Sequence, residues 1–224
     1  MCGRFAVTLP PDAMAQLFGA TPANDLADVP NFNVCPTVPV NVCSLVGSGD
    51  DTGRRLSAMR WGFIPHWYKK PNDGPLLINA RGETVAEKPA FRAAARERRC
   101  LIAMDGFYEW DRQGDEKLPW FIHRRDGAPM VVGGVWQTWD CGDEALTTCA
   151  IVTIEASGQM AEIHNRIPVI LEPDDWALWL GEKGKGAAAL MQAAPDDVYR
   201  MYRVGQEVNS NRASGAGLIE PLNA

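Results

Sequence analysis

The chain has 224 residues, of which 46% are hydrophobic and 22% are charged, and its formal net charge is −6. This composition is typical of a soluble globular protein and excludes a mainly disordered or collagen-like chain. No run of about 18 apolar residues is present, which excludes a transmembrane helix. The first residues lack the apolar core of a secretory signal, so we expect a cytoplasmic protein whose six cysteines are thiols. Because no Cys-x-x-Cys pair occurs, we predict no structural zinc site.

The charges are unevenly distributed along the chain. Residues 54–99 carry 11 basic and four acidic residues, a local balance of +7, whereas the rest of the chain has a balance of −13. This asymmetry is compatible with one basic, phosphate-binding face on an acidic body. A solvated basic helix produces the same pattern, so charge alone leaves both interpretations open.

Short segments punctuated by glycine and proline make up the first half of the chain. Their patterns predict a strand at Phe5–Leu9, a helix with proline in its first turn at Pro11–Phe18, and strands at Val38–Val46 and Leu56–Trp61 on either side of a polar surface loop. An alanine- and arginine-rich helix is predicted at Pro89–Arg99.

The second half contains more predicted strands than helices. The helices are expected at Asp174–Leu180, capped by Asp174, and at Ala187–Ala193. The strands are expected at 100–104, 119–124, 130–136, 146–154, 167–171 and 198–204. Because strands and helices do not alternate regularly, we predict an α+β fold rather than a doubly wound parallel one. We expect a single domain over residues 1–224, with a bent, mostly antiparallel sheet or barrel-like core, peripheral helices and a loosely packed tail at 209–224.

Cys2 becomes the N-terminal residue once Met1 is removed, as is usual before a small residue. Its amine and thiol then have reference pKa values of about 7.7–8.0 and about 8.5, so both are nucleophiles near neutral pH. Such a 1,2-aminothiol adds to an aldehyde as an imine and closes to a thiazolidine. Attack of the thiolate on an acyl carbon and an incidental cysteine after the start methionine are the alternatives. Gly3 permits close backbone approach, and we expect Arg4 to lower the pKa of the thiol and to hold a phosphate.

Three further segments combine polar residues suited to proton transfer and phosphate binding. Glu109 lies between two aromatic residues, which suits a general acid or base but also fits an ordinary strand glutamate facing water. His164 precedes an apolar strand and is either a proton-transfer group or a structural histidine. Asn79 and Arg81 offer hydrogen bonds and a bidentate phosphate contact, unless they belong to a turn with an Arg81–Glu83 ion pair.

The chain has eight tryptophans, which is many for its length. We expect Trp61 and Trp136 to pack inward, as most tryptophans do. Trp67 stands beside His66 and Lys69, and it is the better candidate for an exposed residue on which a base of single-stranded DNA stacks.

Taken together and in this order, the segments resemble the SOS-response-associated peptidase (SRAP) family of abasic-site-processing proteins. Two departures from the family pattern are visible: Asn165 and Ile167 stand where Asp and Met are usual, and Ala103-Met104-Asp105 stands where Pro-Ala-Asp is usual. Neither affects a residue that carries chemistry. The resemblance rests on Met-Cys-Gly-Arg-Phe at 1–5, Arg-Trp-Gly-Phe-Ile-Pro at 60–65, Asn-Ala-Arg-Gly-Glu-Thr at 79–84, Lys-Pro-Ala-Phe-Arg at 88–92, Arg-Arg-Cys at 98–100, Asp-Gly-Phe-Tyr-Glu-Trp at 105–110 and Ile-His-Asn-Arg-Ile-Pro-Val-Ile-Leu at 163–171.

The resemblance implies a monomeric sensor that binds abasic sites in single-stranded DNA and cross-links to them through Cys2, without a metal or an organic cofactor. It also implies a peptidase activity that removes Met1, and an imine at the site would allow β-lyase activity. The catalytic residues implied are Cys2, Asn79, Glu109 and His164. The DNA-binding residues implied are Arg4, Trp67, Arg81, Trp110 and Arg166.

Three other functions remain open from the sequence. The first is an N-terminal-nucleophile amidohydrolase that uses Cys2 on a small amide. The second is a papain-like peptidase with Cys2, His164 and Asn79 as its catalytic set. The third is a non-catalytic module for single-stranded DNA in which Cys2 is incidental.

Overall fold

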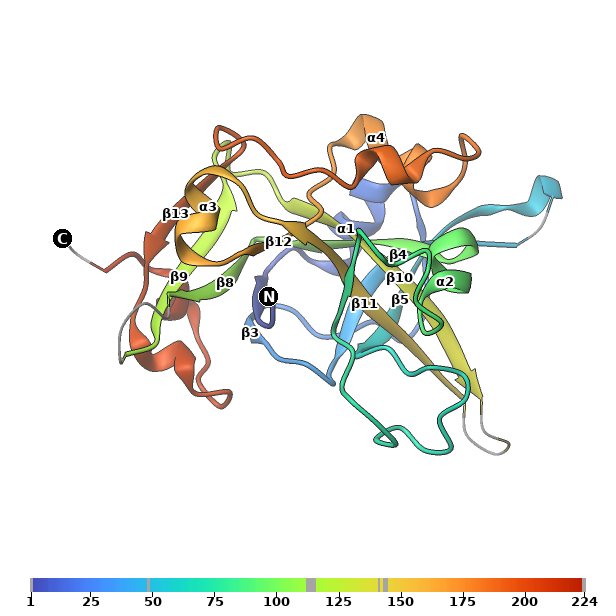
Figure 1. Ribbon diagram of the computed structural model, residues 1–224, viewed down its shortest axis with the longest axis horizontal. Helices are drawn as coiled ribbons and strands as arrows, with labels where there is room; N and C mark the ends of the chain where they lie inside the picture. Colours follow the sequence, from blue (N-terminus) through green and yellow to red (C-terminus); the bar gives the residue numbers. More distant parts are fainter. Residues whose placement is uncertain (1, 48, 112–115, 141, 143–144, 223–224) are drawn as a thin grey trace.

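The computed structural model describes residues 2–47, 49–111, 116–140, 142 and 145–222, and it shows an α+β fold built around a closed barrel (Figure 1). Neighbouring barrel strands are antiparallel except at one seam, where two strands run parallel with Thr148 opposite Arg60 and Cys149 opposite Trp61. In ring order the five strands are β11 (Ala145–Glu155), β10 (Met130–Asp140), β7 (Arg99–Met104), β4 (Pro39–Val46) and β5 (Gly53–Trp61).

Apolar side chains fill the main core. Val42, Leu101 and Ile151 are completely buried, and burying an aliphatic side chain of this size contributes about 1.5–3 kcal/mol. The large indoles are buried with their N–H groups paired: Trp61 Nε1 donates to the carbonyl of Ile78 at 3.0 Å, and Trp179 Nε1 donates to that of Cys100 at 2.8 Å. The inward position expected for Trp61 is therefore confirmed, while Trp136 is only partly buried.

A second sheet of five antiparallel strands lies beside the barrel. Its inner face packs on the main core, and its outer face packs on a small cluster that includes Tyr108, Phe121 and Leu218. The strand order is β13 (Tyr199–Arg203), β9 (Leu118–Arg124), β8 (Gly106–Asp111), β1 (Phe5–Val7) and β3 (Asn31–Val34). Because β7 leads directly into β8, the chain passes from the barrel into this sheet at Asp105.

Two short strands flank the far end of β11. Strand β6 (Asn79–Arg81) pairs with it in parallel, with Asn79 opposite Ile151, and β12 (Arg166–Pro168) pairs with it antiparallel. A third short strand, β2 (Thr21–Pro22), pairs with β5. The residues of β6 and β12 are thereby brought to one end of the barrel.

Four α-helices lie outside the sheets: α1 (Pro11–Phe18), α2 (Arg92–Glu97), α3 (Gly158–Ile163) and α4 (Pro173–Leu180). Short 3₁₀ turns occur at η1 (Gly49–Asp51), η2 (Ala187–Leu190), η3 (Gln206–Asn209) and η4 (Ala216–Ile219). Within the described ranges, no helix has the length and apolar character needed to span a membrane.

The predicted barrel-like, mostly antiparallel α+β architecture is confirmed, as is the helix at Pro11–Phe18. Three local predictions are wrong. The helix expected at Pro89–Arg99 begins only at Arg92. The preceding residues form turns instead, in which the carbonyls of Thr84 and Lys88 accept hydrogen bonds from N–H groups three and four residues later. Asp174 does not cap α4, because Pro173 already occupies the first helical turn.

The third wrong prediction is the helix at Ala187–Ala193, which is a 3₁₀ turn ending at Leu190. The run lies between Gly186, with φ of 135°, and Pro195, so it is too short to propagate a helix. The C-terminal stretch is held to the second sheet: Tyr202 donates its hydroxyl hydrogen to the carbonyl of Ile219 at 2.7 Å.

Besides Cys2, three of the six cysteines lie completely buried in the main core: Cys43, Cys100 and Cys149. Burial raises the pKa of Cys43 and of Cys149 to about 12, so both thiols are protonated and behave as apolar side chains. Cys35 is half-buried. Cys141 lies outside the described residues.

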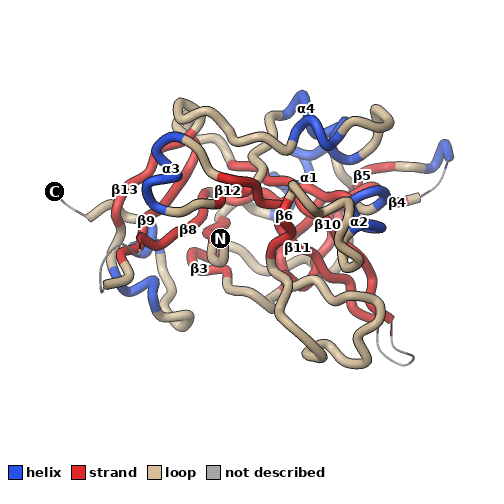
Figure 2. Tube along the Cα trace, in the orientation of Figure 1, coloured by secondary structure: helices blue, strands red, loops and turns tan. Residues whose placement is uncertain are grey.

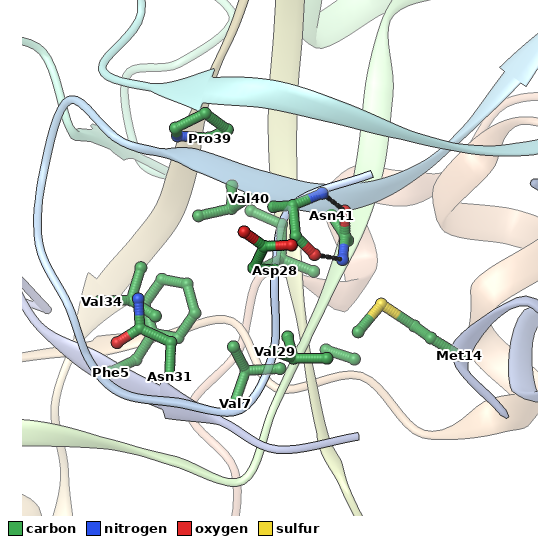
Figure 3. Close-up of a pocket in the computed structure, with 13 residues that line it drawn as sticks. Phe5, Val7, Met14, Asp28, Val29, Asn31, Val34, Pro39, Val40 and Asn41 are labelled. Carbon is green, nitrogen blue, oxygen red and sulfur yellow. Dashed lines mark hydrogen bonds between the residues drawn. The ribbon is translucent and has the colours of Figure 1, made fainter. Parts of the chain in front are cut away.

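A small cavity of about 20 Å³ lies between β1, β3 and β4 (Figure 3). One polar side chain in its wall is already paired, because the Asn41 amide accepts from the N–H of Ala27 and donates to its carbonyl. The cavity has room for about one water molecule and cannot hold a sugar or a base. The candidate site therefore lies elsewhere.

Close packing of Gly133 on Trp179 generates a stability prediction. A Cβ at position 133 would lie 2.5 Å from Trp179 Cζ2, and the indole is held by its bond to Cys100. We expect Gly133→Ala to lower the free energy of unfolding by about 1–3 kcal/mol, measured by urea denaturation. Gly53→Ala is the matched control, because no atom lies within 4 Å of its Cβ position in β5. Equal effects of the two substitutions would contradict this packing.

Candidate active site

Cys2 lies where the barrel and the second sheet meet, just before β1 (Figure 2). Its side chain is completely buried. Asn79, on β6, donates from Nδ2 to the carbonyl oxygen of Cys2 at 2.8 Å. This bond joins the start of the chain to the barrel end, and it places the Cys2 nitrogen and sulfur in a fixed position.

Glu109 lies on β8 and is 1% exposed, so the alternative of a strand glutamate facing water is excluded. Burial first, and then the negative charge of Glu109, raise the pKa of the Cys2 thiol well above its ordinary value. Arg4 does lower this pKa, as expected, but through a hydrogen bond from its backbone, and desolvation outweighs that contribution, so the net shift is upward. The resting thiol is therefore protonated and has a carboxylate close by.

His164 connects this buried pair to solvent. It follows the last turn of α3 and its side chain is 21% exposed. Its Nδ1 accepts a hydrogen bond from the backbone N–H of Arg166 at 3.0 Å, so the neutral ring carries its proton on Nε2. That nitrogen lies 4.0 Å from Oε1 of Glu109. Because this separation is longer than a hydrogen bond, a proton passes between the buried carboxylate and the imidazole only through one bridging water or after a small approach of the two groups.

The predicted catalytic residues therefore lie together: Cys2 with Asn79 and Glu109, and Glu109 with His164. The arrangement differs from that of a papain-like peptidase. In that arrangement an amide orients the histidine. Here the Asn79 amide binds the carbonyl of Cys2, and the imidazole is oriented by the backbone of Arg166.

Arg4 and Trp110 form one fixed unit. Arg4 Nη1 donates to Asn33 Oδ1 at 2.6 Å and to the carbonyl of Val208 at 3.0 Å, and the guanidinium lies 5.8 Å from the centre of the Trp110 ring. Trp110 Nε1 in turn donates to Asn209 Oδ1 at 2.6 Å. Both side chains are only partly exposed, and Trp110 packs against the small cluster on the outer face of the second sheet.

Arg166 is also held within the protein. Its two terminal nitrogens donate to the carboxylate oxygens of Glu83 at 2.7 Å and 2.8 Å. This contact lowers the pKa of Glu83 to about 2. The sequence alternative of an Arg81–Glu83 ion pair is not what the structure shows, because the Glu83 carboxylate is engaged by Arg166. Arg81 is exposed.

Trp67 is 48% exposed, which confirms its expected position at the surface. It lines an open groove of about 700 Å³ together with Trp136 and Arg92, between α2 and β10. None of the four catalytic candidates lines this groove. The structure therefore separates Trp67 from the residues that contact Cys2.

No group of three or more His, Cys, Asp or Glu side chains within the described ranges is arranged to hold a metal ion. The polar groups at Cys2 are an amide, a carboxylate, an imidazole and, after loss of Met1, an amine. This set is suited to proton transfer around a carbonyl carbon rather than to metal ligation.

Residues 1–211 match the family described as SOS response associated peptidase (SRAP). The chain belongs to this family. The match extends over both sheets and over each of the four candidate catalytic residues.

Several relatives of this SRAP chain are named abasic site processing proteins. It is 34% identical to the abasic site processing protein YoaM of Bacillus subtilis over 230 residues, covering 100% of this chain and 99% of the relative. It is 32% identical to the abasic site processing protein YedK of Escherichia coli, covering 99% and 100%. The abasic site processing protein HMCES of Xenopus tropicalis is 29% identical over 78% of this chain and 64% of that protein.

Solved structures confirm the fold. A protein from Bacteroides thetaiotaomicron superposes with a TM-score of 0.85 at 20% identity, covering 99% of this chain and 100% of that one. A protein from Bordetella bronchiseptica superposes with a TM-score of 0.77 at 22% identity, covering 91% and 100%. At these identities the likeness concerns architecture alone.

Sequence reasoning missed Asn33, which is 7% exposed and holds Arg4 in place. Its amide also donates to the carbonyl of Ala213 at 2.7 Å, so it joins β3, β1 and the C-terminal segment. The local signal was weak, because an asparagine between Phe32 and Val34 has the usual appearance of a surface strand residue. Its importance depends on a partner 29 residues away.

The Glu83–Arg166 contact of this SRAP chain can be tested by titration. The folded-state pKa of Glu83, about 2, lies below its unfolded value, so its contribution to stability is present above about pH 4.3 and is lost as the pH falls toward 2. We expect the NMR titration midpoint of the Glu83 carboxyl to rise toward 4.3 in Arg166→Gln. Arg81→Gln is the control and should leave the midpoint near 2. A shift caused by Arg81→Gln instead would show that the alternative pair forms.

Proposed function

We propose that this protein captures abasic sites in single-stranded DNA as a covalent cross-link between Cys2 and the ring-opened sugar. The observation that carries the proposal is the position of Cys2: buried, with its carbonyl held by Asn79 and its thiol beside the Glu109 carboxylate. The names of the SRAP relatives, abasic site processing proteins, support the choice of substrate. We further propose that the protein acts in DNA damage repair, in the cytoplasm and as a monomer.

The reaction begins at the Cys2 nitrogen once Met1 has been removed. We include the removal of Met1 in the proposed activity as its peptidase component. The free amine adds to the C1′ aldehyde of the open deoxyribose, and the carbinolamine loses one water molecule to give an imine. The thiol then adds across the C=N bond: a C–S bond forms, and the proton of the thiol ends on the nitrogen. The product is a thiazolidine, and the only leaving group in the sequence is water.

The protonated state of the thiol suits this order of events. A buried thiol of raised pKa is a weak nucleophile toward electrophiles in solution. Once the amine has formed the imine, however, the sulfur and the electrophilic carbon are held in one molecule, and a well-oriented intramolecular reaction gains a large effective concentration. Glu109 accepts the thiol proton as the C–S bond forms.

Glu109 and His164 then divide the proton transfers. Glu109 is buried and serves the opening of the sugar ring and the loss of water from the carbinolamine. His164, with its proton on Nε2, serves the sugar oxygen and exchanges protons with solvent. Asn79 orients Cys2 by holding its carbonyl. Because an imine acidifies the C2′ proton, the same groups support a side activity as a β-lyase.

The proposed DNA contacts fall into two classes. Arg81 and Trp67 are exposed and bind a phosphate and a base, respectively. Arg4, Trp110 and Arg166 are held by partners within the protein, and they contribute fixed positive charge and a stacking wall beside the abasic residue.

A denaturing gel with a single-stranded oligonucleotide tests the capture. We expect wild type to give a band that survives heat with an abasic strand and not with an intact one. Cys2→Ala should give none, and Cys2→Ser, which keeps the amine, should give a band only after borohydride reduction of the imine. Cys35→Ser is the control and should react as wild type. A heat-stable band with Cys2→Ser in the absence of borohydride would contradict the thiazolidine.

Substitution of Glu109 tests its part in proton transfer. Glu109→Gln preserves the shape of the side chain, so we expect the rate of cross-linking at saturating DNA to fall roughly 10²-fold or more while affinity for intact DNA is unchanged. Glu87→Gln, in an exposed turn, is the control and should have the wild-type rate. An unchanged rate in Glu109→Gln would remove the carboxylate from the mechanism.

A further inference from the structure

Three side chains form a row across the second sheet, and only the first belongs to the site described above. Glu109 on β8 lies directly opposite Trp120 on β9, and Trp120 lies directly opposite Arg203 on β13. Side chains of residues that pair across strands project from the same face of a sheet. Neighbouring strands are about 4.8 Å apart, so the Cα atoms of Glu109 and Arg203 are roughly 10 Å apart.

The packing of the sheet identifies this face. Trp120 and Met201 pack on the main core, whereas Phe121 and Tyr202, one residue further along each strand, pack in the small cluster on the outer face. Arg203 is two residues after Met201 and therefore projects toward the face that carries Glu109. The row thus extends the candidate site away from Cys2.

Arg203 shares two features with the other arginines around the site. Its guanidinium lies 5.9 Å from the centre of the Trp120 ring, as that of Arg4 lies beside Trp110, and its Nε is buried without a hydrogen-bond partner, as are those of Arg4 and Arg166. It differs from them in the contacts of its terminal nitrogens. Within the described part of the chain, no carboxylate pairs with it, whereas Arg4 and Arg166 are both engaged by the protein. An arginine beside an indole presents its two terminal nitrogens as a planar fork, which is the geometry that binds a phosphate in bidentate fashion.

The charges in the row favour an anion at Arg203. A DNA backbone that passes Glu109 meets a buried negative charge, and the cation at the other end of the row, Arg203, offsets that repulsion. Arg81 lies on β6, and β6 and β13 lie on opposite sides of the N-terminus in Figure 2. A strand that crosses Cys2 between these two arginines contacts a cation on each side of the abasic residue.

We propose that Arg203, stacked on Trp120, binds a backbone phosphate of the DNA strand one or two nucleotides from the residue held at Cys2. This inference rests on the proposed function, because it places the strand across Cys2. The alternative is a purely structural cation–π pair, in which Arg203 holds Trp120 in place and contacts no DNA.

Binding of an intact single-stranded oligonucleotide, measured by fluorescence anisotropy over a range of salt concentrations, tests the contact without the covalent step. We expect Arg203→Gln to weaken binding roughly fivefold and to lower the magnitude of the salt slope by about 0.7, the value for one phosphate contact to a single strand. Arg200→Gln is the matched control: it removes the same charge from the same strand at an exposed position. Equal affinities and slopes for the two variants would overturn the proposal.

Methylphosphonate substitution locates the phosphate. Each phosphate of the oligonucleotide is made neutral in turn, and we expect one position to weaken binding by wild type and by Arg200→Gln but not by Arg203→Gln. The absence of such a position would overturn the proposal. If Arg203→Gln lowers the urea midpoint, Arg203→Lys replaces it; that variant keeps the charge, and it should retain the salt slope and the response to the same neutral position.

The outcomes separate this inference from the proposed function. A heat-stable band with abasic DNA, without coupling between Arg203 and any phosphate, would leave covalent capture standing and remove the role of Arg203. If Arg203→Gln is coupled to one neutral phosphate position but no heat-stable band forms with abasic DNA, the phosphate contact would be established and covalent capture would be ruled out.

Discussion

The parallel seam that closes the barrel is the constraint on which the site depends. One edge of β11 is paired first with β5 and then with β6: Gly62 donates to the carbonyl of Cys149, and Gly82 donates to that of Thr153. The chain between β5 and β6 does not pair with this edge. The pairing of β6 with β11 fixes the position of Asn79 along the barrel, and from there its amide donates to the Cys2 carbonyl.

The chemistry of the site follows from burial more than from nearby positive charge. Cys2 and Glu109 are both withdrawn from water, and the carboxylate reinforces the protonated state of the thiol. In the proposed reaction, such a thiol is a weak nucleophile until an electrophilic carbon is attached to the neighbouring nitrogen. His164, oriented by the backbone of Arg166, gives the buried carboxylate its route to solvent.

The arginines around this site differ in how many hydrogen bonds their terminal guanidinium nitrogens make within the protein. Arg4 and Arg166 have short, charge-assisted or carbonyl contacts that fix their positions. Arg4, whose partners are a neutral amide and a carbonyl, keeps its positive charge in a fixed place, whereas the charge of Arg166 is balanced by the Glu83 carboxylate. Arg81 and Arg203 lack comparable carboxylate contacts within the described residues, so their guanidinium groups remain available to an anion.

Much of the fold class could be predicted from the sequence, because alternating apolar residues at 38–46, 100–104 and 146–154 are a local property of each strand. The helix at Pro11–Phe18 could also be predicted from the local sequence, since a proline in its first turn and Gly19 after its end mark both limits. The bounds of α2 and the capping of α4 were predicted wrongly, because local hydrogen-bonded turns before Arg92 and the proline at Pro173 outweighed the helix and capping preferences of the other residues.

The sequence by itself determined which candidate residues carry reactive groups: a thiol at Cys2, and acid, base and amide groups at Glu109, His164 and Asn79. Only the tertiary structure decided the direction of the Cys2 pKa shift, the pairing of Glu83 with Arg166 rather than Arg81, and the row from Glu109 to Arg203. The physical reason is that desolvation and ion pairing depend on distances between residues that are far apart in the chain. Those distances are set by strand register and by closure of the barrel, and no local pattern of residues encodes them.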